Sequence, residues 1–257
     1  YVTKKNNILN LKYKNYHDES KIIRIKSEIN SFLGNEFYLD EYEPIDWQLD
    51  FISGYRWNEN TWYRDIKVYD LDGVDIKRPW ELSRLQHLPR LAFNYYIDND
   101  KEHLAKECVY QITDWILNNR VRRGVNWRTT MEVSIRACNM LLTIDLIQNS
   151  KFVSKKFLSL VKKSMIDHGN HIMNNLEKSF DFSGHNHFMA NVVGLVFLGI
   201  CFESKFSNRW LTYGLKEFVK SNDFQFHEDG GNFEGSAYYH RLVYEMSLMT
   251  SIFIQNN

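Results

Sequence analysis

HNHFMANVVGLVFLGICF, at residues 185–202, is the stretch that decides the fold class. Three polar side chains open it, His185, Asn186 and His187, and after Phe188 nearly every residue is apolar. This pattern predicts an apolar helix that begins in a polar loop. Because buried polar groups are costly unless they are paired, the opening cluster is either a helix cap or a site.

The same helical periodicity runs from Trp80 to the end of the printed sequence, and no proline follows Pro89. Apolar residues recur every three or four positions. They predict helices at 80–98, 101–119, 129–149, 153–177, 185–202, 205–220 and 235–255.

The predicted helices are joined by tight and long connections in alternation. In a stack of antiparallel helices, every second connection lies at the same end. The long loops 120–128, 178–184 and 221–234, with the approach 72–79, therefore share one end, together with several helix N-termini. We expect an all-α fold, an incomplete (α/α) toroid of antiparallel helical hairpins; an ordinary helix bundle is the alternative.

The first part of the chain has a different character. Residues 1–67 are interpreted as an N-terminal arm, a helix at 18–33 and an aromatic-rich segment of short strands or irregular coil, and residues 68–257 as the toroid domain. The residues after Tyr1 do not resemble a signal peptide.

Composition narrows the function classes. The 257 residues hold 32 Lys and Arg against 32 Asp and Glu, so no global field draws the protein to nucleic acid or to an anionic membrane. No apolar run is long enough to predict a transmembrane helix. The three cysteines are far apart, and the two histidines of the opening cluster lack a supporting carboxylate at metal-ligand spacing. We therefore expect no metal and no cofactor.

A polar stripe crosses the helix predicted at 129–149. Glu132, Arg136, Asn139 and Thr143 are spaced by four, three and four residues, so they share one face of an otherwise apolar helix. Such a stripe lines a cavity or forms a paired network; alternatively, Glu132 and Arg136 form an i,i+4 pair on a solvated face. Asn126 and Trp127 at the helix entrance favour a pocket.

A second polar cluster precedes the last predicted helix. Asp229-Gly230-Gly231 predicts a turn, and Glu234, Tyr239 and His240 follow at the start of the helix. Tyrosine needs nearby positive charge or hydrogen-bond donors to act as a base. Taken alone, Tyr239 is better explained as a core aromatic residue with a paired hydroxyl.

Over residues 45–245 the chain resembles the heparinase II/III-like polysaccharide lyases, specifically their N-terminal α/α toroid. The order and spacing of several short motifs carry the resemblance: Arg78-Pro79-Trp80-Glu81, Arg84, Leu91-Ala92, Trp115, Asn126-Trp127, Met131-Glu132, Arg136, Asn175-Leu176-Glu177, Asn186-His187, Asn191, Gly194-Leu195, Asp229-Gly230, and Glu234-x-Ser236-x-x-Tyr239-His240.

The resemblance implies β-elimination on a polysaccharide that contains uronic acid. It assigns Asn186 to neutralise the substrate carboxylate, and Tyr239 with His187 to move protons. The remaining candidates would contact substrate: Arg84, Asn126, Trp127, Glu132, Arg136, His185, Glu234 and His240. The resemblance also implies a periplasmic or secreted enzyme whose C-terminal β-sandwich is absent from this chain.

Two other functions remain open from the sequence. One is a glycoside hydrolase on the same fold, with Glu132, Asp229 or Glu234 as paired carboxylates. The other is a non-catalytic module that binds glycans or serves in assembly, which would keep the aromatic residues but would be indifferent to Tyr239→Phe.

Overall fold

The computed structural model describes residues 19–33, 42–68, 71–178 and 185–257, and this part of the chain is predominantly helical. Its α-helices are α2 (Glu19–Leu33), α3 (Lys77–Ser83), α4 (Leu88–Ile97), α5 (Glu102–Asn118), α6 (Thr130–Ile147), α7 (Lys155–Asn174), α8 (Asn186–Cys201), α9 (Lys205–Gln225) and α10 (Ala237–Gln255). Two short 3-10 turns are η2 (Tyr63–Asp65) and η3 (Val125–Trp127). The expected all-α class is confirmed.

The predicted N-terminal segments lie partly outside the described residues, since residues 1–18 and 34–41 are not described. The helix expected at 18–33 is present as α2. Within 42–68 and 71–76 the chain is irregular coil with isolated β-bridges, such as Leu49 with Arg56, and contains no strand. The aromatic-rich segment is thus coil rather than short strands.

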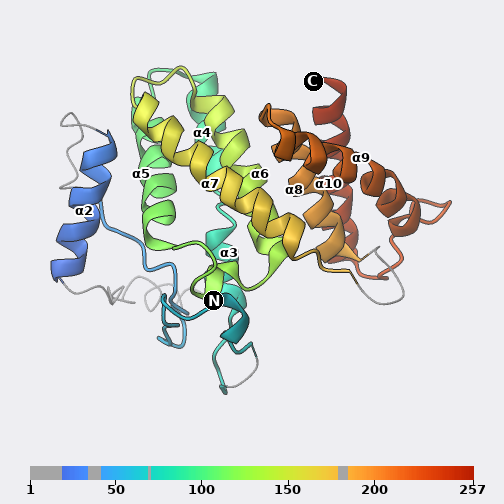
Figure 1. Cartoon of the computed structure of the whole chain (residues 1–257), viewed down its shortest axis with the longest axis horizontal. Helices are drawn as coiled ribbons and strands as arrows, with labels where there is room; N and C mark the ends of the chain where they lie inside the picture. Colours follow the sequence, from blue (N-terminus) through green and yellow to red (C-terminus); the bar gives the residue numbers. More distant parts are fainter. Residues whose placement is uncertain (1–18, 34–41, 69–70, 179–184) are drawn as a thin grey trace, which may run out of the picture.

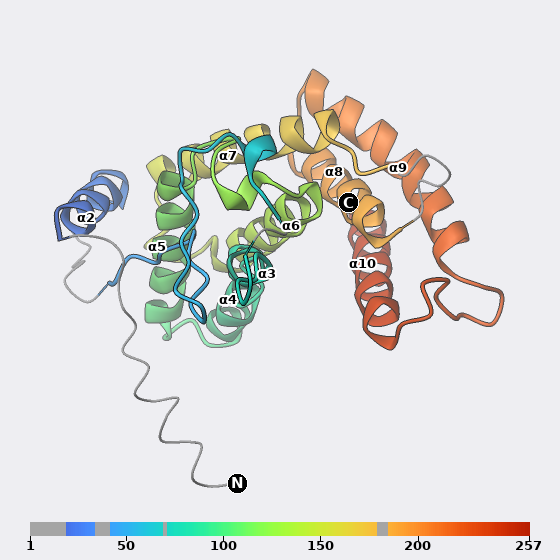
Figure 2. The same cartoon turned by 90° about the horizontal axis from the view of Figure 1, so that it is seen from below.

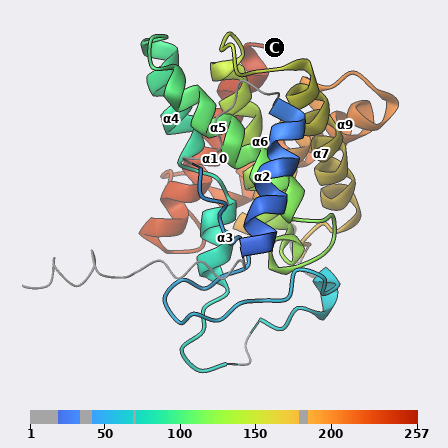
Figure 3. The same ribbon diagram turned by 90° about the vertical axis from the view of Figure 1, so that its left-hand side faces the viewer.

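The helices from α4 onward form two layers that curve into an arc (Figure 2). In one layer α4 packs on α6, α6 on α8, and α8 on α10, while α5, α7 and α9 form the other layer. This arrangement agrees with antiparallel hairpins, and the incomplete (α/α) toroid stays a prediction. Figure 3 shows α2 lying against α5 and α7 at one edge.

The alternation of tight and long connections is also realised. Helices α6, α8 and α10 begin at the same end of the molecule, and the tight turns near residues 98–101, 149–153 and 202–204 lie at the other end (Figure 1). Most of the long loop at 178–184 is outside the described residues. The candidate site lies at the N-terminal ends of these three helices.

The helix predicted at 80–98 is broken into α3 and α4, which corrects the sequence-based interpretation. Leu85 lies between them, fully buried, with a φ of 57°. Pro89 falls in the first turn of α4, where its missing N–H costs nothing, whereas inside one continuous helix it would leave a carbonyl of the preceding turn without its donor. The chain therefore ends one helix and starts another.

Helix α8 is apolar around most of its surface because α6, α9 and α10 all pack against it. Gly199 allows the closest of these approaches: a Cβ atom there would lie 2.6 Å from the Cβ of Leu211 on α9. In the described part of the chain no helix is both long and apolar enough to span a membrane.

Candidate functional site

The first turn of α8 binds the loop that precedes α10. The backbone N–H of Asn186 donates to Glu234 Oε1 at 2.9 Å, and the Asn186 amide donates to both carboxylate oxygens, at 3.0 and 2.7 Å. A carboxylate at a helix N-terminus also meets the positive end of the helix dipole. Asn186, one of the residues expected to contact substrate, therefore already holds a carboxylate group.

His187, the next residue, is held by Glu177. Its Nδ1 lies 3.1 Å from Glu177 Oε1, and its side chain remains 43% exposed. The hydrogen bond to Glu177 is the main cause that raises the pKa of His187 above its ordinary value, against the opposing effect of burial. Glu132 and Glu234 raise this pKa further through their charges.

His185 caps α8 through its side chain, which accepts the backbone N–H of Phe188. Its ring centroid lies 5.7 Å from that of His187. Burial, and then the charge of His187, lower the pKa of His185. The pKa values of these two neighbouring imidazoles are therefore shifted in opposite directions, a division that often separates acid from base in catalytic sites.

Arg84 and Glu132 form a bidentate ion pair beside this cluster. Arg84 Nε and Nη2 donate to the two oxygens of Glu132 at 2.5 and 2.8 Å, and both side chains are nearly buried. Burial alone would lower the pKa of Arg84, but Glu132 raises it above its usual range, and the charge of Glu81, which accepts a hydrogen bond from Arg84 Nη1 at 2.8 Å, adds to this effect.

Tyr239 and His240 follow Glu234 into the first turn of α10. The backbone N–H of Tyr239 donates to the capping Ser236 hydroxyl, and its side chain is 40% exposed. His240 lies between Phe226 and Tyr244, with ring centroids at 6.2 and 6.4 Å. Through Glu234 this unit is joined to α8, so the starts of α8 and α10 form one assembly.

Asn126, Trp127 and Arg136 lie in the packed interior, which does not fit the expectation that they line a substrate subsite. All three are at most 1% exposed. Asn126 donates to the carbonyl of Trp47 and to Asn119, and Trp127 donates to the carbonyl of Asn119. Distant segments of the chain therefore cover the side chains that the local pattern suggested would be open.

Arg136 is buried without a carboxylate hydrogen-bond partner among the described residues. Its guanidinium donates to the carbonyls of Ser83 and Asn126 and to His168 Nε2, and its carbon lies 3.9 Å from the ring centroid of Trp115. Burial lowers the pKa of Arg136 to about 9, against the opposing charge of Glu132. The alternative of a solvated Glu132–Arg136 pair is therefore wrong.

The polar stripe of α6 instead forms a paired network against the break between α3 and α4. Glu132 binds the Arg84 side chain, Arg136 reaches the Ser83 carbonyl, and Asn139 Nδ2 donates to the Arg84 carbonyl at 2.8 Å. Thr143 completes the stripe by donating to the carbonyl of Asn139. Side chains of α6 thus supply hydrogen-bond donors to backbone carbonyls at the end of α3, where the helix is interrupted.

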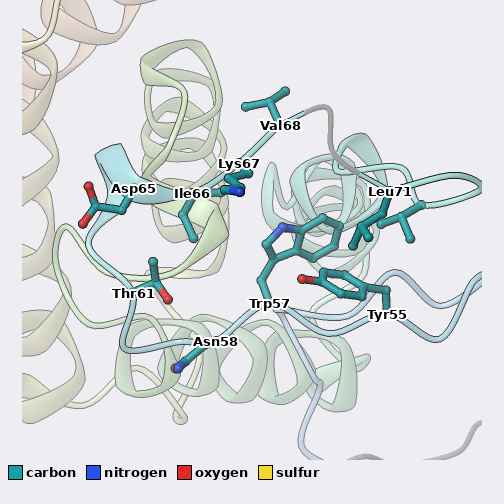
Figure 4. Close-up of a pocket in the computed structure, with 10 residues that line it drawn as sticks. Tyr55, Trp57, Asn58, Thr61, Asp65, Ile66, Lys67, Val68 and Leu71 are labelled. Carbon is teal, nitrogen blue, oxygen red and sulfur yellow. The ribbon is translucent and has the colours of Figure 1, made fainter.

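Two cavities lie apart from this assembly. One, of about 490 Å³, is lined by coil and aromatic residues of the N-terminal segment, including Tyr55, Trp57 and Asp65 (Figure 4). The other, of about 470 Å³, lies between α4, α6 and α10 and includes Phe93 and Met249. No group of three or more metal-ligating side chains occurs within the described ranges.

Comparison with known proteins identifies the family. The family model described as Heparinase II/III N-terminus matches residues 1–254. The chain belongs to the heparinase II/III family. A heparin-sulfate lyase of Pedobacter heparinus is 28% identical to it over 167 residues, which are 63% of this chain and 24% of that protein.

Two solved structures of heparan sulfate lyase HepC from Pedobacter heparinus share the fold. One superposes with a TM-score of 0.58 at 21% identity, covering 96% of this chain and 37% of that one. A HepC mutant gives 0.56 at 22% identity, covering 93% and 34%. The chain thus spans about a quarter to a third of these heparinase II/III relatives, and their helical fold extends over nearly all of it.

One further member of the site, Glu177, was not predicted as a site residue. Glu177 appeared in the sequence only as part of a family motif, and its role depends on His187, ten positions later.

Proposed function

We propose that this chain is the helical part of a polysaccharide lyase that cleaves a uronic-acid polysaccharide by β-elimination. The observation that carries the proposal is the pair of hydrogen bonds from the Asn186 side-chain amide to the Glu234 carboxylate at the start of α8. An amide that is already positioned to bind one carboxylate can bind that of a uronate. Membership of a family that includes heparin-sulfate lyase supports the same reaction class.

The reaction needs three groups. Asn186 neutralises the uronate carboxylate, which makes the C5 proton acidic enough to remove. A base takes that proton, the C4–O4 bond breaks, its electron pair leaves with O4, and a C4–C5 double bond forms from the C5–H electrons. An acid then protonates O4. We assign Tyr239 and His187 to these two proton transfers.

The site can bind the carboxylate of an acidic polymer only if Glu234 leaves the Asn186 amide. Glu234 occupies the Asn186 amide and would repel a second carboxylate there. We therefore propose that substrate displaces the Glu234 carboxylate, while His187, whose pKa is raised, offsets part of the negative charge of the polymer.

The rest of the enzyme is proposed from its relatives. Because the chain covers only part of their length, we propose that a further domain, the β-sandwich implied by the resemblance, completes the cleft. A periplasmic or secreted location is proposed on the same basis. The sequence favours no particular uronate polymer.

The direct test is the ultraviolet absorbance of the unsaturated product, followed while the protein is incubated with heparan sulfate, alginate and an unsulfated uronate exopolysaccharide. We expect absorbance to rise with at least one polymer and Tyr239→Phe to abolish the rise. Tyr96→Phe, an exposed tyrosine on α4, is the matched control and should leave the rate unchanged. A flat trace from both this chain and the full-length protein would contradict the proposal.

A further inference from the structure

Glu177 is held in place by three parts of the site. Its Oε2 accepts the backbone N–H of Met131, in the first turn of α6, at 2.7 Å and the Asn191 amide at 3.2 Å. Its own backbone N–H donates to Asn191 Oδ1 at 2.8 Å. Its Oε1 faces His187 Nδ1. The carboxylate is thus bound from α6 and from α8, on both sides of the imidazole contact.

Asn191 makes this arrangement rigid. It is fully buried on the inner part of α8, and it binds both the backbone and the side chain of Glu177. A carboxylate fixed by several donors cannot follow a moving imidazole, so the imidazole must orient toward the carboxylate. The His187 side chain is 43% exposed, so this contact with Glu177 does not enclose the imidazole.

We propose that Glu177 is a positioning residue for His187: its carboxylate accepts a hydrogen bond from Nδ1–H and leaves Nε2 as the nitrogen that exchanges a proton with the substrate. The inference rests on the proposed lyase function and extends it, because neither the family match nor the sequence motifs gave Glu177 a role. An ionised carboxylate accepts hydrogen bonds only, so Nδ1 must carry the hydrogen whenever this contact is made.

The charges around His187 agree with this arrangement. Glu177, Glu132 and Glu234 all raise the pKa of His187, with Glu177 making the largest contribution. His185, the other imidazole in the cluster, is held toward its neutral form. Arg84, beside Glu132, is the nearby permanent positive charge. Glu177 thereby sets both the orientation and the charge of His187.

A purely structural role for Glu177 makes a different prediction. If the carboxylate serves only to cap α6 through Met131, its replacement will change stability but will not move the proton on His187. The two roles are therefore separated by the imidazole itself rather than by a loss of activity.

The test is a pH titration of His187 by long-range ¹H–¹⁵N NMR, with the signal assigned from its absence in His187→Gln. Above its pKa, we expect wild-type His187 to carry its proton on Nδ1. In Glu177→Gln we expect a mixture of tautomers and a lower pKa, and in Glu177→Asp, which keeps the charge, a pKa that stays raised. Glu102→Gln, which removes the carboxylate bound to Ser150 at the opposite end of the molecule, should leave His187 unchanged.

Two outcomes would overturn the proposal. One is a wild-type His187 protonated on Nε2, a result that does not depend on whether a Glu177 variant folds. The other is a Glu177→Gln protein, folded by circular dichroism, with an unchanged His187 tautomer and pKa.

A second test measures the cleavage kinetics of the variants on a polymer that the wild type cleaves. There we expect Glu177→Gln to lower kcat by about tenfold or more, and by no more than the ~10²–10⁴ that the whole proton-transfer group contributes, with little change in KM. Glu177→Asp should recover part of the loss. A wild type that is inactive both as this chain and as the full-length protein, but shows the expected Nδ1 tautomer, would reject the proposed reaction while leaving the Glu177–His187 contact established.

Discussion

The side-chain amide of Asn186 holds both carboxylate oxygens of Glu234, and the backbone N–H of Asn186 binds the same carboxylate. This contact joins the start of α8 to the loop before α10, which are far apart in the sequence. It stabilises the helix end by supplying an acceptor to an otherwise unpaired N–H. The same geometry is what a uronate carboxylate would need.

Asn186→Asp tests this contact directly. An aspartate at a helix N-terminus is ordinarily favourable, but here it would face Glu234 at hydrogen-bond distance. We expect the free energy of unfolding at pH 7 to fall by about 1–3 kcal/mol, and the loss to shrink near pH 4 as one of the two carboxyl groups takes up a proton. Urea unfolding at both pH values measures this.

The control for that experiment is Asn94→Asp. Asn94 is exposed on α4 and its amide binds a carbonyl of its own helix. Its substitution should change stability by no more than about 0.5 kcal/mol. Equal stability of Asn186→Asp and the wild type at pH 7 would show that the contact does not form in solution.

The Arg84–Glu132 pair should show strong coupling. Removing one partner from a buried ion pair leaves an uncompensated charge, so Arg84→Met and Glu132→Leu should each cost about 3–5 kcal/mol, and the double variant much less than their sum. A double-mutant cycle by chemical unfolding measures the coupling. The exposed pair Asp98–Lys101 is the comparison, with an expected coupling below about 1 kcal/mol.

Arg136→Lys distinguishes a buried guanidinium from a solvated one. Lysine keeps the charge but cannot reach three acceptors at once or stack its head group on Trp115. We expect a loss of about 2 kcal/mol or more, since buried acceptors left without donors cost about 1–3 kcal/mol each. Thermal unfolding measures the loss, and the exposed Arg90→Lys should be neutral; a neutral Arg136→Lys would contradict the burial.

His171→Phe should stabilise the protein against acid. Neither ring nitrogen of His171 has a hydrogen-bond partner among the described residues, and the rings of Tyr63 and Trp127 flank it at 5.0 and 5.1 Å. Burial, followed by the charges of nearby arginines, lowers the pKa of His171 to about 3. As the pH falls, His171 therefore becomes protonated in the unfolded chain at a higher pH than in the folded protein. The free energy of unfolding decreases as the pH falls from about 6.5 toward 3.

Phenylalanine removes both the unpaired nitrogens and the proton uptake. At pH 7.5 we expect unfolding stability to be unchanged or higher by about 1 kcal/mol, and the decline toward pH 4.5 to be smaller than in the wild type. Urea unfolding across this range measures it. The exposed His103→Phe should keep the wild-type pH dependence, and an unchanged pH dependence in His171→Phe would refute the assignment.

Much of the helical framework was predictable from local pattern. The apolar spacing located α5 to α10 to within a few residues, except for the C-terminal end of α9, because packing against neighbours requires a continuous apolar face. Pro89 indicates a possible break in the helix predicted at 80–98. Proline is tolerated in the first turn of a helix and disrupts a helix interior, and the sequence alone does not say which of these positions Pro89 occupies.

The site was only partly predictable, and for a physical reason. The polar residues at the start of α8 and before α10 could be found because they interrupt apolar runs. The local pattern could not show whether Asn126 and Arg136 are exposed or buried, because the groups that cover them, such as Trp47 and His168, come from other segments of the chain.

The sequence by itself determined the all-α class, the order and approximate lengths of most helices, and the end of the stack where the long loops gather. These follow from periodicity and connection length, which are local properties. Only the tertiary structure decided that Glu132 pairs with Arg84 rather than Arg136, that Asn186 grips Glu234, and that Glu177 holds His187. Those contacts depend on the distances between helices, and helix packing sets these distances over the whole domain.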